Sequence, residues 1–252
     1  MINLFVRSNK IYFFILIGLN SWCNYSYAGE PVALSVGLNT SLDFQAYKGK
    51  TAWMSVLPTA FYDNKKIYIE GDELGVYLLN NEQNQFRLNA YYDDSYFSPS
   101  GKLNALRTRK WSVMSGASYM RITPFGGFKA QIGTDILSRS KGTVATLSYL
   151  AELNTGKWSF YPEIGYQWSN SQYNDYYYGV TASEARNSGV TEYHPKDSLQ
   201  PYMDLNFNYN LNKKWNVFGG VNINYLSNQQ YRSPIVRNRI DFSPSLGIVF
   251  KF

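Results

Sequence analysis

Long stretches in which every second residue is apolar dominate this sequence, and residues 199–225 show the pattern most clearly. Apolar and polar residues alternate from Leu199 to Leu211, the segment 212–214 interrupts them, and the alternation resumes from Trp215 to Tyr225. Successive side chains of a β-strand point to opposite faces, so this period predicts two long antiparallel strands with one apolar face and one face rich in asparagine.

The length of these strands points to a barrel that crosses a membrane. Alternation over segments of about 10 residues, with aromatic residues near the ends, is typical of a transmembrane barrel whose outer face meets lipid and whose inner face meets water. A soluble β-sandwich also alternates, but its strands usually have only about 5 to 6 residues. The chain contains 23 Tyr, 15 Phe and 6 Trp, yet its mean hydropathy is −0.35. We therefore predict an all-β fold, a transmembrane antiparallel β-barrel.

The alternating segments number twelve, the even count that a closed bacterial barrel requires. Their approximate ranges are 31–41, 51–62, 66–71, 74–80, 86–96, 109–121, 127–138, 143–153, 158–170, 199–211, 215–225 and 240–252. Short connections such as 63–66 and 212–214 alternate along the chain with long ones such as 97–108, 171–197 and 228–237. Barrels of this class place short turns in the periplasm and long loops outside.

The N-terminus has the features of a secretory signal peptide. Arg7 and Lys10 precede the apolar run 11–19, and Ser26-Tyr27-Ala28 supplies small residues where a signal peptidase cleaves. The run is too short for a membrane helix, which needs about 20 residues. We expect residues 1–28 to be removed and residues 29–252 to form one outer-membrane barrel domain.

Cleavage would also remove Cys23, the one cysteine of the chain, so the mature protein is expected to have no disulfide framework and no thiolate metal site. Its net charge would fall from +6 to +4, because Arg7 and Lys10 lie in the signal peptide. This excess is spread along the chain, whereas nucleic-acid binding needs clustered Lys and Arg. We expect no nucleic-acid partner and no cofactor.

Several charged residues fall on the polar face of the predicted strands and are expected to point into the barrel. They are Arg87, Lys129, Asp135, Glu152, Glu163, Asp204, Arg239 and Asp241. Charges inside a barrel need partners or water, so they either form ion pairs that fill the interior or line a pore. We favour ion pairs that fill the interior.

The chain's single histidine, His194, lies near Asp197 and Ser198 in a long loop, but we expect it to be a surface residue rather than a catalytic base.

The loop 171–197 interrupts the two-residue period with three consecutive tyrosines. Its candidate interaction residues are Tyr176, Tyr177, Tyr178, Gly179, Glu184, Ser188 and Gly189. Tyrosine offers a large contact area with a polar tip, so this loop is either a recognition surface or a folded lid over the barrel mouth.

The last residues form a second distinctive feature. Every second residue from Ile240 to Phe252 belongs to one apolar face, and the chain ends with Phe250 and Phe252 on that face. This ending resembles the signal that the barrel assembly machinery reads in outer-membrane proteins, which predicts contact with that machinery during biogenesis. An ordinary edge strand is the alternative.

Several of these residues resemble the signature of the MipA/OmpV family of outer-membrane proteins. The matching positions are 176–180, Glu184, 188–189, Tyr193 and 201–202, together with Arg109, 114–116, Asp135, Leu137, Gly142 and 233–236. The resemblance covers nearly all of the mature chain. The sequence departs from the family pattern at Ser138-Arg139-Ser140-Lys141, where relatives tend to carry Asp-Asn-Ser-Asn, and at Arg237, which replaces a usual acidic residue.

The resemblance implies a non-enzymatic barrel in the outer membrane of a Gram-negative bacterium. The member that gives the family its name joins a lytic transglycosylase to a penicillin-binding protein in murein synthesis. We therefore expect a scaffold associated with the peptidoglycan synthesis machinery. Two alternatives remain open at this stage: a narrow porin or substrate-specific channel, and a surface adhesin that uses the loop 171–197.

Overall fold

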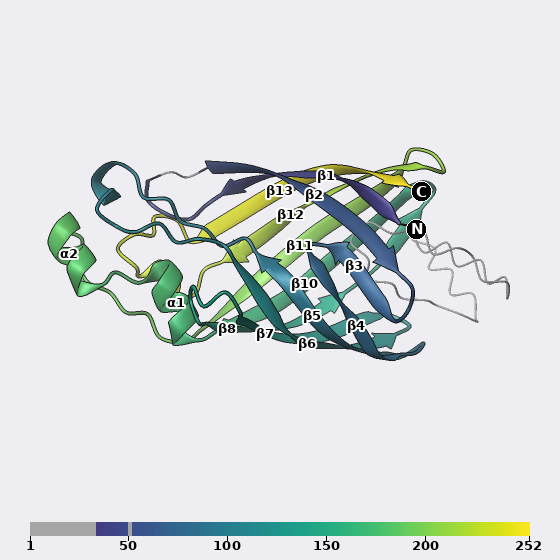
Figure 1. The fold of residues 1–252 in the computed structure, drawn as a ribbon, viewed down its shortest axis with the longest axis horizontal. Helices are drawn as coiled ribbons and strands as arrows, with labels where there is room; N and C mark the ends of the chain where they lie inside the picture. The colour runs from purple at the N-terminus through teal and green to yellow at the C-terminus, as the bar shows by residue number, and fades with distance from the viewer. Residues whose placement is uncertain (1–33, 50–51) are drawn as a thin grey trace, which may run out of the picture.

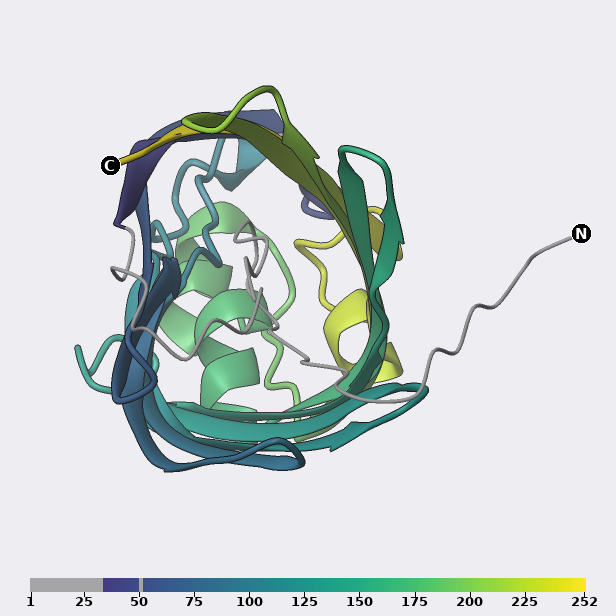
Figure 2. The ribbon, with the colours of Figure 1, turned by 90° about the vertical axis from the view of Figure 1, so that its right-hand side faces the viewer.

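The computed structural model describes residues 34–49 and 52–252, which form a closed antiparallel β-barrel with helices at one end (Figures 1 and 2). The predicted signal peptide lies outside these described residues. None of the helices in the described part of the chain is long and apolar enough to cross a membrane.

The barrel wall follows the order of the strands in the sequence. The strands are β1 (Ser35–Phe44), β2 (Ala52–Asp63), β3 (Ile67–Gly71), β4 (Glu73–Asn80), β5 (Asn84–Asp93), β6 (Ser112–Thr123), β7 (Gly126–Asp135), β8 (Thr143–Leu150), β9 (Leu153–Thr155), β10 (Trp158–Ser169), β11 (Ser198–Asn210), β12 (Trp215–Tyr225) and β13 (Ile240–Lys251). β8 and β9 pair with different parts of β10, so they occupy one position in the wall. Within the described residues the barrel therefore has twelve strands, and the predicted fold is confirmed.

Pairing between the first and last strands closes the barrel. β13 pairs with β1 from Ser35↔Lys251 to Phe44↔Phe242, and each other strand pairs with its neighbours in the chain. Closure leaves no long free edge there, which matters in lipid because an unpaired backbone group has no water to bind. The two short strands predicted at 66–71 and 74–80 are present as β3 and β4.

The barrel is apolar outside and polar inside. Leu38, Met54 and Leu147 point outward with side chains 54%, 62% and 62% exposed. In the hairpin β11–β12, Leu205 opposite Val221 faces outward, whereas Asp204 opposite Asn222 faces the interior. Because successive residues alternate between faces, this arrangement is the one that the two-residue period predicts, and an apolar belt of this kind suits lipid.

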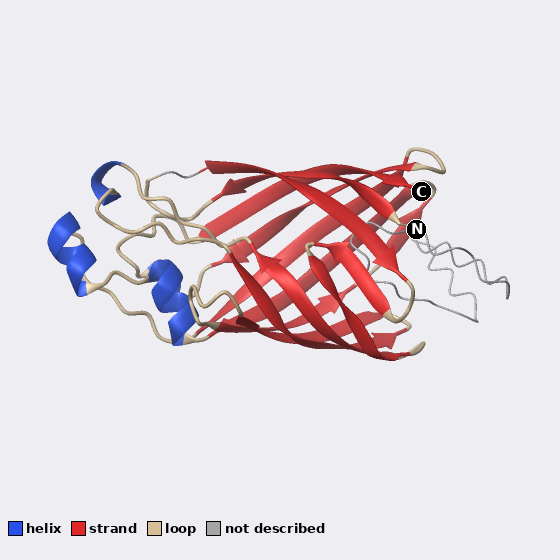
Figure 3. Cartoon of the chain, viewed as in Figure 1, coloured by secondary structure: helices blue, strands red, loops and turns tan. Residues whose placement is uncertain are grey.

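The two ends of the barrel differ (Figure 3). The start of β1, the C-terminus and the short turns lie at one end, which we call the turn end, and the helices and long connections lie at the other, which we call the loop end (Figure 1). The helices are η1 (Gly101–Leu103), α1 (Ser171–Tyr178), α2 (Ala182–Ser188) and α3 (Asn228–Tyr231). All of these segments lie in connections that the sequence predicts to be loops.

Apolar side chains fill part of the interior near the turn end. Phe61, Phe218 and Val249 come from β2, β12 and β13, are almost completely buried, and form one cluster. The rings of Phe61 and Phe218 meet edge to face, with their centroids 5.6 Å apart. A Cβ on Gly247 would lie 2.2 Å from Cζ of Phe218, so only glycine leaves room for this ring.

Candidate functional site

The segment 170–197 folds into a lid across the loop end, which Figure 2 shows as helices seen through the barrel. The Asn170 side chain caps α1 by accepting a hydrogen bond from the Tyr173 N–H. Thr181 and Glu184 form a capping box at the start of α2, and Gly189 ends that helix with φ 71°. These caps are local sequence signals for helices within a segment predicted as a loop.

The tyrosines of the lid point toward the barrel and pack against its residues. Tyr177 is fully buried and packs with Met114, Val144 and Tyr173, while Tyr178 packs against a second cluster that includes Val180. The Tyr173 hydroxyl contacts Ser95 Oγ at 2.7 Å, and the Tyr177 hydroxyl donates to the Lys110 carbonyl at 3.1 Å. Of the two roles weighed for this loop, the packing supports the lid. An adhesin role stays a prediction.

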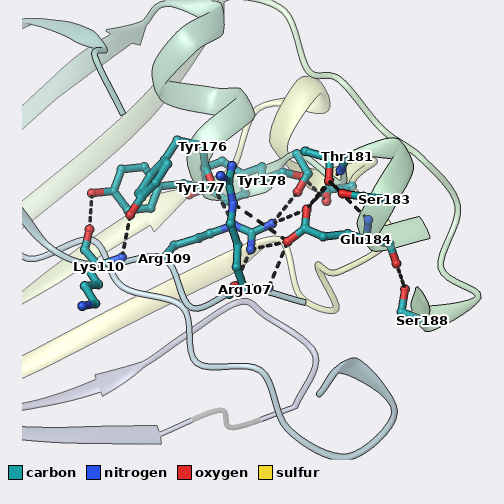
Figure 4. Close-up of polar contacts among 12 residues, drawn as sticks. Arg107, Arg109, Lys110, Tyr176, Tyr177, Tyr178, Thr181, Ser183, Glu184 and Ser188 are labelled. Carbon is teal, nitrogen blue, oxygen red and sulfur yellow. Dashed lines mark hydrogen bonds and ion pairs between the residues drawn. The ribbon is translucent and has the colours of Figure 1, made fainter. Parts of the chain in front are cut away.

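One buried ion pair connects the lid to the loop that follows β5 (Figure 4). Arg109 Nη1 lies 2.7 Å from Glu184 Oε1, and Arg109 Nη2 lies 3.2 Å from Oε2. Arg109 Nε also donates to the Tyr176 carbonyl at 2.9 Å, and Nη2 donates to the Gly179 carbonyl at 3.0 Å. The guanidinium therefore binds the end of α1 and the start of α2 together.

Hydrogen bonding keeps Glu184 ionised in this buried place. Burial by itself raises the pKa of a carboxyl group, but the backbone N–H groups of Arg107 and Thr181 and the Arg109 guanidinium lower the pKa of Glu184 to about 2. Burial lowers the pKa of Arg109, an effect that its hydrogen bonds to Glu184 oppose. A buried pair of this kind needs both partners, because either charge alone would be buried without compensation.

The predicted interaction residues Ser188 and Gly189 lie at the outer end of the lid. The Ser188 hydroxyl donates to the Glu184 carbonyl at 2.7 Å, and Gly189 follows α2. Figure 1 shows α2 as the part of the lid farthest from the strands. These two residues are thus separated from the tyrosines, which lie toward the barrel.

His194 lies in the exposed part of the lid. Its Nδ1 is 2.7 Å from Asp175 Oδ1, and its Nε2 is 3.1 Å from Glu192 Oε1. These hydrogen bonds raise the pKa of His194. Both ring nitrogens contact carboxylates, whereas Ser198 bonds to Asn174. No group of three or more His, Cys, Asp or Glu side chains in residues 34–49 and 52–252 is arranged to hold a metal ion.

Two of the predicted interior cations form ion pairs with glutamates that were not among the predicted interior residues. Arg87 Nη1 lies 3.1 Å from Glu70 Oε2, and both side chains are nearly completely buried. Lys129 Nζ lies 3.9 Å from Glu73 Oε2. The two-residue period could have placed Glu70 in the interior, because Glu70 alternates with the apolar Ile69 in the short strand β3.

Neutral partners accompany the predicted interior carboxylates on the strands. Glu163 accepts from the Tyr202 hydroxyl at 2.7 Å, Asp204 accepts from the Asn222 amide at 2.6 Å, and Asp241 lies opposite Asn224. These partners come from neighbouring strands, so the strand register brings them together. Glu152 accepts from the Asn154 amide at 2.8 Å in the break between β8 and β9.

Two of the residues predicted to line the interior organise loop-end connections instead. Asp135 is the last residue of β7, and its carboxylate accepts hydrogen bonds from the turn that follows. Arg239 precedes β13, and its guanidinium lies 4.9 Å and 5.0 Å from the ring centroids of Tyr225 and Tyr231. At the other end of the barrel, the Phe250 ring lies 5.1 Å from that of Phe252, which is 76% exposed.

Comparison with known proteins gives a consistent family match. The model of the family "MltA-interacting protein MipA" matches residues 33–252. The MltA-interacting protein of Escherichia coli K12 is 31% identical over 222 residues, which cover 86% of this chain and 90% of that protein. The putative outer membrane protein YiaT of the same strain is 26% identical over 223 residues, which cover 87% of this chain and 91% of that protein. An outer membrane channel of Pseudomonas putida F1 has a TM-score of 0.46 at 10% identity, covering 90% of this chain and 98% of the channel.

Proposed function

The chain belongs to the MltA-interacting protein MipA family of outer-membrane β-barrels, and from that premise we propose that it is a non-enzymatic scaffold that displays docking sites for murein-processing enzymes. Its partner would be a lytic transglycosylase, as the name of its E. coli relative suggests, and a penicillin-binding protein would be the second enzyme. The turn end would face the periplasm, because short turns of such barrels lie there.

The observation that carries this proposal is the construction of the turns. In three of them an asparagine side chain closes the turn: Oδ1 of Asn64, Asn81 and Asn212 each accepts hydrogen bonds from the N–H groups two and three residues later, at 2.8–3.1 Å. An Asx turn of this kind holds the backbone in one conformation. Docking to a rigid surface loses less conformational entropy than docking to a flexible one, so these turns are suited to display.

The exposed side chains at the turn end suggest what a partner would contact. Lys66, Lys213 and Lys214 are exposed on the asparagine-closed turns, and Phe125, in the turn between β6 and β7, is 82% exposed. A partner surface that combines carboxylates with an apolar recess would complement this set. The filled regions at both ends of the interior also leave the outer surfaces as the places where a protein could bind.

The test is binding of the purified lytic transglycosylase from the same bacterium to the barrel in lipid nanodiscs. We expect K66E/K213E to weaken binding, because it reverses two charges on the turns. K102E/R186E is the matched control, since it reverses two exposed charges at the loop end. The proposal fails if the wild-type barrel captures no enzyme above an empty nanodisc, or if both variants bind as well as wild type.

A narrow channel is the second candidate, supported by the polar middle of the barrel. The half-exposed carboxylate of Asp204 and the amides of Asn206 and Asn222 face this region. Single-channel recording of the folded protein separates the two candidates. Discrete openings that change in D204N would favour the channel, whereas silent bilayers with folded protein would favour the scaffold.

A further inference from the structure

A group of basic residues lies at the loop end, where the apolar wall of the barrel ends. Trp111 immediately precedes β6, and the connection after β7 folds back beside it. Arg139 Nη1 donates to the Trp111 carbonyl, and the Arg139 guanidinium carbon lies 4.1 Å from the centre of the Trp111 ring. Lys110 and Lys141 are exposed beside these two residues in the sequence.

The turn that carries Arg139 is built by a carboxylate. Asp135 Oδ2 accepts from the Ser140 N–H at 2.6 Å and the Lys141 N–H at 2.9 Å, while Oδ1 accepts from the Leu137 N–H at 2.9 Å. The hydroxyls of Ser112 and Ser140 also donate to this carboxylate. Because Asp135 is buried and satisfied by these donors, it organises the turn without pairing with the two cations.

The turn also holds strained backbone at two residues. Ser138 and Lys141 have φ of 54° and 53°, a left-handed conformation that is unfavourable for residues other than glycine. Such strain persists where surrounding contacts impose it, and here the Asp135 hydrogen bonds impose it. The result is a tight turn that presents Arg139 and Lys141 on either side of Ser140.

The basic side chains lack acidic partners. Among residues 34–49 and 52–252, no carboxylate oxygen lies within 4.0 Å of the charged nitrogens of Lys110, Arg139 or Lys141. The lid fixes Lys110 through its backbone: its N–H donates to the Tyr176 hydroxyl at 3.0 Å, and its carbonyl accepts from Tyr177. The backbone of Lys110 and the guanidinium of Arg139 are therefore fixed, and no carboxylate of the described residues pairs with any of the three cations.

The surroundings of this group identify the kind of ligand. Tyr92 and Trp111 form an outward-facing aromatic pair, with ring centroids 5.2 Å apart and ring planes tilted by 46°, and such pairs mark the boundary between lipid and water. Next to the basic turn, Ile132, Ile136 and Leu137 are exposed on the outer surface. A ligand that covers both parts must have an anionic head and apolar chains. Phosphate suits the head, since arginine presents several donors in a planar fork to phosphate oxygens.

We propose that Lys110, Arg139 and Lys141, with Trp111, form a binding site for a phosphorylated lipid headgroup of the outer leaflet. The headgroup phosphate binds the free donors of Arg139 and the two lysine ammonium groups, and the acyl chains lie along Ile132, Ile136 and Leu137. Trp111 holds the guanidinium in place by stacking. The proposed scaffold function does not require this site, so the two proposals stand or fall separately.

The experiment measures lipid binding by the folded full-length mature barrel in detergent, with native mass spectrometry as the readout and lipid A that carries two phosphates as the probe. R139Q/K141Q should lower the affinity by about 30-fold, because each basic side chain near an anionic surface contributes about 1 kcal/mol. K102Q/R186Q removes the same charge from η1 and α2, farther from the strands, and should bind as wild type (Figure 1). Heat-modifiable gel mobility shows that each variant is folded.

Four outcomes would overturn the proposal. R139Q/K141Q could bind lipid A as tightly as wild type, or the control variant could lose as much affinity, which would indicate diffuse charge attraction. Enzymatically dephosphorylated lipid A could bind equally well, which would leave only the apolar belt as the ligand contact. Full competition by millimolar inorganic phosphate would identify a free phosphate site and not a lipid site.

Discussion

Arg109 and Glu184 form a salt bridge of 2.7 Å between two loop-end segments, and the Arg109 side chain is completely buried. The two residues are 75 positions apart in the chain, and no regular strand pairing brings them together. The arginine also binds three backbone carbonyls, in Arg107, Tyr176 and Gly179. This one side chain therefore connects the loop after β5 to both helices of the lid.

Replacing the arginine should release the lid without unfolding the barrel. Arg109→Gln leaves the Glu184 carboxylate buried without a cation, and breaking a buried pair in this way costs about 3–5 kcal/mol. We expect limited proteolysis to cut within residues 171–197 much faster than in wild type, while heat-modifiable gel mobility stays intact. Arg107→Gln is the control, because Arg107 is half exposed and lies 3.9 Å from Glu184. Equal protease resistance of the two variants would contradict the role assigned to Arg109.

The lid should open in acid. The folded pKa of Glu184, about 2, lies below its ordinary value of 4.5, so its contribution to lid stability is present above pH 4.5 and is lost as the pH falls toward 2. We expect the protease sensitivity of residues 171–197 to be constant between pH 6 and pH 5 and to rise below pH 4.5, measured with an acid-active protease. Glu184→Gln should remove most of this rise, and a wild-type lid equally resistant at pH 2 and pH 6 would refute it.

His194 should titrate above its usual pKa of 6.5, because Asp175 and Glu192 both stabilise the protonated ring. Its contribution to lid stability is present below pH 6.5 and is lost as the pH rises through the raised pKa. NMR titration of the imidazole tests the shift, and D175N should move the pKa back toward 6.5. A wild-type pKa at or below 6.5 would show that these contacts do not persist in solution.

Gly247→Ala should disturb the apolar cluster at the turn end. The new Cβ would lie 2.2 Å from Cζ of Phe218, and overpacking of this kind costs about 1–3 kcal/mol. The temperature at which the folded gel band disappears should fall. A second change, Phe218→Leu, removes the clashing ring atoms, so G247A/F218L should be more heat-resistant than G247A. If G247A melts as wild type does, the ring is free to move aside.

Removal of the interior rings tests whether they occlude the barrel. F61A/F218A should increase single-channel conductance relative to wild type, because it deletes two side chains that are almost completely buried inside the wall. L38A/L246A is the control, since it shortens two side chains exposed on the outer face. Unchanged conductance in F61A/F218A would locate the barrier elsewhere, for example at the Arg87–Glu70 pair.

The sequence predicted the strands well and their ends less well. The hairpin of residues 199–225 matches β11 and β12 closely, because its turn is short and its period is unbroken. β5 and β7 were expected to reach residues 96 and 138 but end at Asp93 and Asp135. At both places a carboxylate binds backbone N–H groups of the following residues, so the chain turns while the alternation of residue types continues.

The candidate site could be located from the sequence, but its internal arrangement could not. The three tyrosines marked the segment as unusual because they interrupt the strand period. The capping boxes at 181–184 and 227–230 were local signals for helices. No local pattern, however, indicates that Arg109 rather than another arginine binds Glu184, since that choice depends on how two distant loops pack.

The sequence by itself determined that this chain forms a closed barrel with an apolar outer face and a polar inner face. A two-residue period decides which face each side chain joins, and lipid requires every backbone group of the wall to be paired. Only the tertiary structure decided what fills the interior and covers the mouth. Phe61, Phe218 and Val249 meet from three strands, and Arg109 reaches Glu184 across the mouth, because closure of the barrel brings distant segments within contact distance.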